Sequence, residues 1–436
     1  GGQDWDPSQV SLPAHVVDAL EILLITKDNL DGATVRDLFE RAQQLGLTLG
    51  RLPKLTDFKS GAADKVEVRP IAVEDLLGRP QTVLDRAGMS RLIEGRPVLV
   101  TGAGGSIGAE LVRQVAALKP SRLVLLDSSE FALYRIDLEL SEQEGSPDHP
   151  ALLADVRDGT RLEQIFSRYR PEVVFHAAAL KHVPLVEANP FEGLRTNCLG
   201  TLELARAARR HGARAMVMIS TDKAVNPTNI MGASKRIAEM ITQANDLDSE
   251  SPTRFVTVRF GNVLGSTGSV VPLFQRQLAR GGPLTVTHPD MKRYFMTIRE
   301  AVELVLQASV HALLVHDGKV EPTGCIHVLD MGEPVRILDL AEQMVRLAGR
   351  EPGRDIEIKF TGLRPGEKLF EEIFHGSEEL KESGVDGVFV AHPRALQRDA
   401  LYAALEQLAQ ACQSEDHDRL IDLVQGLVPE YQPSQT

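Results

Sequence analysis

Two short segments of the chain contain residue types that can move protons. The first is Ser220-Thr221-Asp222-Lys223 at the end of an apolar run, and the second is Met231-Gly-Ala-Ser-Lys235. A carboxyl group and an amine supply an acid and a base when a closed site raises the pKa of the acid and lowers that of the amine. An isolated Thr-Asp-Lys is more often a loop turn with solvated charges. Its position between a strand end and a helix favours a site for proton transfer.

The segments that must position these residues alternate short apolar runs with helical patterns. Strands are expected at residues 97–101, 122–127, 151–154, 173–176, 215–220 and 255–259. Such alternation predicts βα units around a parallel sheet that is buried on both faces. The predicted fold class is therefore α/β, with a doubly wound parallel sheet and a smaller C-terminal substrate-binding lobe.

A glycine-rich turn follows the first of these strands and precedes a helical pattern over residues 109–117. The residues expected to surround a pyrophosphate there are Gly102, Gly105, Ser106, Ile107 and Gly108. Glycines alone are weak evidence, but a turn between a strand and a helix directs backbone amides at an anion. The turn therefore predicts a Rossmann-type site for a nicotinamide dinucleotide.

The end of the second strand indicates which dinucleotide binds. Asp127 follows Gly108 at the spacing expected for a carboxylate that binds the adenosine ribose, and a carboxylate repels the 2′-phosphate of NADP. Ser129 and Glu130 belong to the same turn, and Arg135 leaves NADP as the less favoured alternative. We therefore expect NAD.

Two further strand ends are expected to contact the cofactor. Asp155, followed by Val156, either accepts a hydrogen bond from the adenine amino group or caps the next helix. Ala177, Ala178 and Ala179 are small, so they either let the cofactor approach closely or pack a helix tightly on the sheet.

Composition limits the other classes of function. The formal net charge of -13 argues against a general nucleic-acid surface, because phosphate binding requires clustered Lys and Arg. The three cysteines are far apart, so no disulfide framework or metal site is expected, and a reducing compartment fits best. No segment is long and apolar enough to span a bilayer. The chain begins Gly1-Gly2, and we expect it to be part of a longer protein.

Four longer motifs resemble one family. They are Ala179-Leu-Lys-His-Val-Pro-Leu-Val-Glu187, Ser220-Thr-Asp-Lys-Ala-Val-Asn-Pro227, Val258-Arg-Phe-Gly-Asn-Val-Leu-Gly-Ser266 and Leu363-Arg-Pro-Gly-Glu-Lys-Leu369. Together, over roughly residues 70–395, they resemble the nucleotide-sugar 4,6-dehydratases of the extended short-chain dehydrogenase/reductase superfamily. The likeness is closest to the large membrane-anchored branch of polysaccharide and protein-glycan biosynthesis. Met231 stands where the superfamily has tyrosine, as it often does in that branch.

The resemblance implies a reaction and a role for each residue. UDP-N-acetylglucosamine would lose water across C5 and C6 after oxidation at C4, giving a 4-keto-6-deoxy sugar with C5 retained. NAD would be tightly bound and recycled, with no metal. Asp222 would protonate the departing C6 hydroxyl, Lys223 would remove the C5 proton, and Thr221 would hold the C4 oxygen. Lys235 would bind the nicotinamide ribose beside Met231.

Residues outside these segments are expected to bind the UDP-N-acetylhexosamine substrate. They are Lys181, Asn262, Ser266, Arg293, Arg364 and Glu367. These side chains offer donors and acceptors for a sugar, a diphosphate and a ribose. A surface arginine is usually just solvated, and Arg293 is the weakest of these predictions.

The expected organisation has three parts. Residues 1–70, with helices at 15–25 and 34–47, form an N-terminal segment and linker, which by resemblance would be the remnant of a second Rossmann-like domain. Residues 71–265 form the NAD-binding domain, and residues 266–436 form the substrate-binding lobe, with helices at 393–428 closing the structure and some strands returning to the main sheet.

By resemblance, a homo-oligomer, at least a dimer, would form through residues 192–209 and 235–246. The full protein would lie at the cytoplasmic face of the inner membrane, attached through segments absent from this chain.

Two other functions compete with the dehydratase. An NAD-dependent UDP-sugar 4-epimerase generally keeps the tyrosine and lacks an acid-base pair for C5 and C6, so Met231 and Asp222-Lys223 speak against it. A catalytically silent NAD-binding module would explain the missing tyrosine, but not the presence of Asp222, Lys223 and Lys235.

Overall fold

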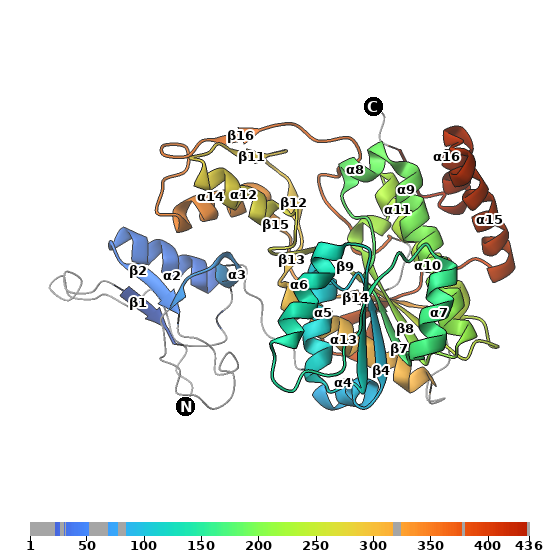
Figure 1. Ribbon diagram of the computed structural model, residues 1–436. Helices are drawn as coiled ribbons and strands as arrows, with labels where there is room; N and C mark the ends of the chain where they lie inside the picture. The colour runs from blue at the N-terminus through green and yellow to red at the C-terminus, as the bar shows by residue number, and fades with distance from the viewer. Residues whose placement is uncertain are drawn as a thin grey trace.

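The computed structural model describes residues 22–26, 30, 32–51, 69–76, 84–316, 324–376 and 380–433. Its centre is a nine-stranded sheet (Figure 1). The strand order is β17 (Lys381–Val385), β18 (Val388–Ala391), β14 (Ile326–Leu329), β9 (Arg254–Phe260), β8 (Ala215–Thr221), β7 (Val173–His176), β4 (Pro97–Thr101), β5 (Arg122–Asp127) and β6 (Ala151–Leu153). The strands from β14 to β6 all run parallel, whereas β18 is antiparallel to β14 and β17 is antiparallel to β18.

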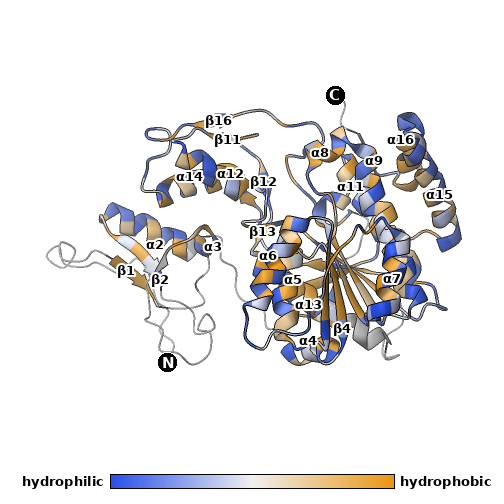
Figure 2. Ribbon diagram, in the orientation of Figure 1, coloured by the Kyte–Doolittle hydropathy of each residue, from blue (hydrophilic) through white to orange (hydrophobic). Residues whose placement is uncertain are grey.

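Helices cover both faces of this sheet. One face carries α4 (Arg86–Ile93), α5 (Ser106–Ala117), α6 (Glu130–Ser141) and α13 (Ile298–His316). The other carries α7 (Gly159–Tyr169), α8 (Val183–Ala188), α9 (Pro190–Leu194), a π-helical turn η3 (Arg195–Gly200), α10 (Thr201–Arg210) and α11 (Ile230–Asp246). Because side chains alternate along a strand, Val98 and Val100 of β4 enter the first core while Leu99 enters the second. Figure 2 shows the resulting apolar strands between helices with polar outer faces.

This order confirms the predicted α/β doubly wound class. The chain reverses its direction of strand addition between β4 and β7, and ligands bind at such a switch point in open parallel sheets.

The lobe is smaller than the sequence predicted. It contains α12 (Val270–Ala279), α14 (Ile337–Leu347) and the strand pairs β11 (Leu284–Val286) with β16 (Ile358–Phe360) and β12 (Lys292–Arg293) with β15 (Val335–Arg336). The short strands β10 (Asn262–Val263) and β13 (Phe295–Met296) pair with each other. In contrast, α13 and β14 return to the main sheet, because both bury their apolar side chains there.

An N-terminal unit packs beside the lobe (Figure 1). It contains β1 (Ile22–Ile25), α2 (Gly32–Gln44), β2 (Thr48–Arg51), β3 (Arg69–Pro70) and α3 (Val73–Leu76). The predicted helix at 15–25 is wrong over residues 22–25, which pair in parallel with β2, and residues 15–21 lie outside the described ranges. A short apolar run is compatible with either a helix or a strand, and only pairing with a partner strand decides between the two. A buried ion pair of 3.0 Å joins Arg51 to Asp75, so this unit extends past the expected boundary at residue 70.

Two helices lie within the predicted C-terminal helical region at 393–428, α15 (Arg398–Ser414) and α16 (His417–Leu427). They pack on α11 and η3 at the opposite side of the molecule (Figure 1). Every residue of α11 is buried within this chain. Residues 235–246, one half of the face predicted to form a dimer, therefore pack within this chain, where apolar residues of α11 share a core with Leu401, Leu405 and Leu408 of α15.

None of the helices in the described ranges is both long and apolar enough to cross a membrane.

Candidate active site

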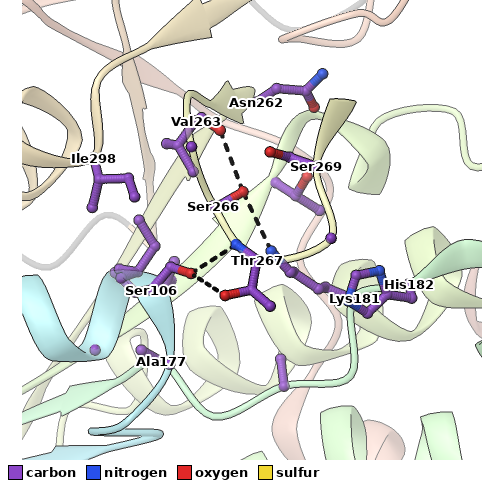
Figure 3. A pocket seen from close by; sticks show the side chains of 18 of the residues that line it. Ser106, Ala177, Lys181, His182, Asn262, Val263, Ser266, Thr267, Ser269 and Ile298 are labelled. Atoms are coloured by element: carbon purple, nitrogen blue, oxygen red, sulfur yellow. Dashed lines mark hydrogen bonds between the residues drawn. The ribbon is translucent and has the colours of Figure 1, made fainter. Parts of the chain in front are cut away.

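A large cavity opens at the carboxyl ends of β4, β7, β8 and β9 and continues under the lobe. Its volume is about 1340 Å³, whereas pockets for single small ligands usually measure about 300–1,000 Å³. The cavity is therefore larger than a single small ligand usually needs. Figure 3 shows the part where the glycine turn meets the lobe.

The glycines of the turn are needed for different structural purposes. Gly102 has φ +67°, and a Cβ there would lie 2.6 Å from the backbone nitrogen of Ala178. A Cβ on Gly108 would lie 1.8 Å from the carbonyl oxygen of Gly102, so this glycine lets α5 approach the strand. A Cβ on Gly105 would meet only that same oxygen, at 3.3 Å, and Gly105 lines the cavity. Gly105 is thus the glycine that leaves room for a ligand.

A loop from the lobe side touches this turn (Figure 3). The Ser106 hydroxyl accepts from the Thr267 amide at 3.1 Å and lies 3.3 Å from the Thr267 hydroxyl. Next to it, Ser266 accepts from Lys181 Nζ at 3.5 Å and donates to the Val263 carbonyl at 3.3 Å. The loop therefore bridges the predicted dinucleotide and substrate ends of the cavity.

Asp127 connects the end of β5 to the glycine turn. Its two carboxylate oxygens accept from the backbone amides of Gly104 at 2.9 Å and Ser129 at 2.8 Å. A carboxylate can accept about four hydrogen bonds, so capacity for a ribose hydroxyl remains. Ser129 caps α6 through the amide of Ala132, and Glu130 is exposed in its first turn.

Asp155 does not cap a helix, contrary to one of its two predicted roles. The residue that caps α7 is Asp158, whose side chain accepts from the amide of Arg161. Asp155 instead pairs with Arg157 at 2.6 Å. These interactions outweigh burial and lower the pKa of Asp155. The neighbouring Val156 is buried against Gly200.

The three alanines after β7 lie in different surroundings. Ala177 and Ala179 line the cavity, whereas Ala178 packs against Gly102.

Thr221, Asp222 and Lys223 form one hydrogen-bonded group where β8 passes into the 3-10 turn η4 (Asp222–Ala224). Oδ1 of Asp222 accepts from the Thr221 hydroxyl at 2.9 Å and from Lys223 Nζ at 2.9 Å. Thr221 and Lys223 line the cavity, but Asp222 is fully buried behind them. Within the described part of the chain, its Oδ2 has no hydrogen-bond partner. Asp222 is therefore linked to the cavity through its hydrogen bonds with Thr221 and Lys223.

Lys223 is surrounded by oxygen atoms. Besides Asp222 it donates to Oδ1 of Asn262 at 3.0 Å, and Oε1 of Glu371 lies 3.9 Å away. Burial alone would lower the pKa of Lys223, but the charges of Asp222 and Glu371 outweigh it and raise that pKa. A base would need a lowered pKa, so this arrangement holds Lys223 in its charged form.

Met231 and Lys235 lie one turn apart on α11, and both line the cavity. Lys235 Nζ donates to the Ile219 carbonyl at 2.7 Å. Burial, partly offset by the charge of Glu239, lowers the pKa of Lys235 to about 8. Met231 is 2% exposed and belongs to the core of this face, so it also has the ordinary packing role of a methionine.

All six predicted substrate residues line the cavity, as the structure places Lys181, Asn262, Ser266, Arg293, Arg364 and Glu367 around it. Arg293 is nevertheless not a solvated surface arginine. It is buried and donates to the carbonyls of Lys292, Lys368 and Leu369 at 2.7, 2.8 and 3.1 Å. Much of its donor capacity therefore anchors the segment that carries Arg364 and Glu367.

Several site residues were not predicted from the sequence. Glu371 beside Lys223 looks like its exposed neighbour Glu372 in the sequence. Asn197 lies on η3, a type of turn that often marks functional sites, and its amide bonds both the amide and the carbonyl of Leu180 at 2.8 and 2.9 Å. This clamp positions the loop that carries Lys181.

No group of three or more His, Cys, Asp and Glu in the described ranges is arranged to hold a metal ion.

The chain matches the family described as polysaccharide biosynthesis protein over residues 98–393, and it belongs to that family. The capsular polysaccharide biosynthesis protein CapD of Staphylococcus aureus is 49% identical over 334 residues, covering 76% of this chain and 54% of the relative. The probable polysaccharide biosynthesis protein EpsC of Bacillus subtilis is 43% identical over 370 residues, covering 84% and 60%. This chain thus spans little more than half the length of these relatives.

More distant relatives carry two different activities in their names. A UDP-N-acetylglucosamine 4,6-dehydratase (inverting) of Campylobacter jejuni is 31% identical, covering 64% of this chain and 78% of the relative. A UDP-glucose 4-epimerase of Rickettsia massiliae is 32% identical, covering 66% and 80%. Among solved structures, Pen from Bacillus thuringiensis has a TM-score of 0.59 at 29% identity, covering 70% of this chain and 90% of Pen. The chain is thus a member of the extended short-chain dehydrogenase/reductase superfamily of epimerases and dehydratases.

Proposed function

We propose that this chain is the catalytic part of an NAD-dependent UDP-N-acetylglucosamine 4,6-dehydratase of polysaccharide or protein-glycan synthesis, with C5 retained. The observation that carries this proposal is the hydrogen-bonded pair of Asp222 and Lys223 beside Thr221, at a cavity that Met231 also lines. Elimination across C5 and C6 needs an acid and a base, whereas epimerisation at C4 needs neither at those positions.

The residues around the glycine turn fit NAD. Gly105 leaves open space above the first turn of α5, and unpaired amides at a helix start attract a pyrophosphate. Asp127 retains hydrogen-bonding capacity for the adenosine ribose, and Lys235, which lines the cavity, would bind the nicotinamide ribose. Bound NAD would accept a hydride from C4 and return it to C6.

The proton steps can be assigned to the chain's own residues. The C4 hydroxyl would pass its proton to the Thr221 hydroxyl, which already donates to Asp222, and Asp222 would become protonated. Asp222 would then supply this proton to the C6 hydroxyl, which leaves as water. Because Asp222 itself is buried, the proton would again pass through a side chain that is hydrogen-bonded to Asp222. Lys223 would remove the C5 proton and return a proton to C5. The sum is the loss of one water molecule.

The substrate end would be bound by side chains that line the lobe side of the cavity. Lys181, Arg364 and Glu367 offer two cations and one carboxylate for a diphosphate and a ribose. Asn262, which accepts from Lys223, would lie beside the sugar.

The alternative function is a UDP-sugar 4-epimerase, which the relative of that name supports. Incubation with UDP-N-acetylglucosamine in deuterated water, followed by mass spectrometry and proton NMR, separates the two. We expect loss of one water and deuterium at C5, and the C5 coupling constants report its configuration. A C4-epimerised sugar of unchanged composition would establish the epimerase instead. Untouched substrate with bound NAD would favour a silent NAD-binding module.

A further inference from the structure

We propose that Glu371 is a positioning residue that holds the ammonium group of Lys223 between two carboxylates and thereby controls when Lys223 can act as a base. This inference rests on the proposed function, in which Lys223 removes the C5 proton. Glu371 does not line the cavity, so it acts through Lys223 and not on a substrate.

Geometry is the first argument. Lys223 Nζ lies 2.9 Å from Oδ1 of Asp222 on one side and 3.9 Å from Oε1 of Glu371 on another. The Glu371 side chain is only 5% exposed, so solvent screens this interaction weakly. A shift of about 1 Å would bring the pair within hydrogen-bonding distance.

Charge balance is the second argument. Glu371 also lies 3.8 Å from the Arg293 guanidinium, so two carboxylates face two cations. The cluster consists of Asp222, Lys223, Arg293 and Glu371. The other titratable groups that face it are Lys181, Tyr294 and Lys368. Transfer of one proton from Lys223 Nζ to Glu371 would give a neutral amine and a neutral carboxylic acid without changing the net charge. Burial favours the protonated form of Glu371 and raises its pKa, which makes it a suitable acceptor.

The third argument is where Glu371 comes from. It lies on the segment of residues 364–372, which also brings Arg364 and Glu367 to the cavity. The segment is attached to the loop after Lys223, because the Gly366 carbonyl accepts from Thr228 and Asn229, each at 2.9 Å. A substrate bound by Arg364 therefore contacts the same segment that sets the surroundings of Lys223.

The test is a pH titration of Lys223 in the variants Glu371→Gln, Glu371→Asp and Glu372→Gln. Competitive acetylation with acetic anhydride, followed by peptide mass spectrometry, reports the fraction of neutral Lys223 without any turnover. Removing a carboxylate near an amine lowers its pKa, so the labelling midpoint in Glu371→Gln should fall by about one pH unit or more. Glu371→Asp keeps the charge and should shift less. Glu372→Gln removes an exposed charge from the same segment and should match the wild type.

The pH profile of kcat/KM supplies a second readout. Its ascending limb should move to lower pH in Glu371→Gln by the same amount as the labelling midpoint. An unchanged midpoint in folded Glu371→Gln would overturn the proposal, and so would an equal shift in Glu372→Gln. If the wild type does not dehydrate the substrate, the proposed function fails while the labelling experiment still decides the role of Glu371.

Discussion

Glu239 on α11 and Arg259 on β9 form a two-point ion pair inside the protein, with Nε to Oε1 at 3.0 Å and the terminal nitrogen to Oε2 at 2.8 Å. Both side chains are at most 1% exposed. Oε1 of Glu239 also accepts from the hydroxyl of Ser220 at 2.7 Å. Because Ser220 precedes Thr221, this ion pair fixes the strand end on which the proposed chemistry depends.

Glu239→Gln should therefore destabilise the protein strongly. It removes the carboxylate with which the buried Arg259 pairs, and breaking a buried pair costs about 3–5 kcal/mol. Urea unfolding measures the change in the free energy of unfolding. The matched control is Glu351→Gln, because Glu351 pairs with Arg354 at 60% and 78% exposure and such pairs contribute about 0–1 kcal/mol. Equal effects of the two substitutions would contradict the structural role of Glu239.

Asp222→Asn and Lys223→Met should each remove most of the activity without loss of cofactor. An acid or base of this kind contributes roughly 10²–10⁴-fold to the rate, so kcat should fall by at least about 100-fold. Bound NAD per protein chain, measured after release by denaturation, should stay at the wild-type level, because neither side chain belongs to the glycine turn. Near-normal kcat in either variant would remove that residue from the mechanism.

The glycine turn offers a test that separates folding from binding. Gly108→Ala places a methyl group 1.8 Å from the Gly102 carbonyl oxygen, so α5 must move and the unfolding temperature should fall markedly. Gly105→Ala has ordinary φ of -70° and one neighbour at 3.3 Å, so it should fold but bind NAD more weakly. Calorimetry of unfolding and of NAD binding checks both. Unchanged NAD affinity in Gly105→Ala would argue against a pyrophosphate at this turn.

His176 should make the protein less stable as the pH falls below neutrality. The ring lies buried between the hydroxyls of Thr101 and Thr201, and burial, with the charge of Lys235, lowers the pKa of His176 to about 3. Between about pH 6.5 and pH 3 the unfolded chain binds a proton at this residue that the folded chain does not, so the free energy of unfolding falls by about 1.4 kcal/mol per pH unit. The loss is absent above that window and complete below it.

Urea unfolding of His176→Asn and of the wild type between pH 7.5 and 5 measures this contribution. The variant should be less stable at pH 7.5 but should depend less on pH across the window. The control is His288→Asn, at a partly exposed residue of the lobe, which should keep the wild-type slope. A wild-type slope in His176→Asn would show that other groups cause the acid sensitivity.

Local pattern was enough to predict much of the framework. Short apolar runs bounded by turns placed the strands β4 to β9 of the main sheet within one or two residues, although β17 and β18 were not predicted. The position of the glycines between β4 and α5 indicated the turn. These features depend on residues that are neighbours in the sequence, where strand spacing, helix periodicity and glycine conformation act directly. The same holds for Thr221, Asp222 and Lys223, which are adjacent in the chain and at the end of one strand.

Tertiary structure alone decided which distant groups meet. Nothing near Glu371 in the sequence distinguishes it from Glu372, and only the docking of residues 364–372 on the loop after β8 brings it to Lys223. Likewise, the family resemblance implied a dimer contact for residues 235–246, and no sequence pattern indicated that α15 of the same chain packs on α11. Amphipathic patterns specify that a face is buried and leave its partner open, because the hydrophobic effect is not directional. The burial of Asp222 behind its neighbours follows from the same long-range packing.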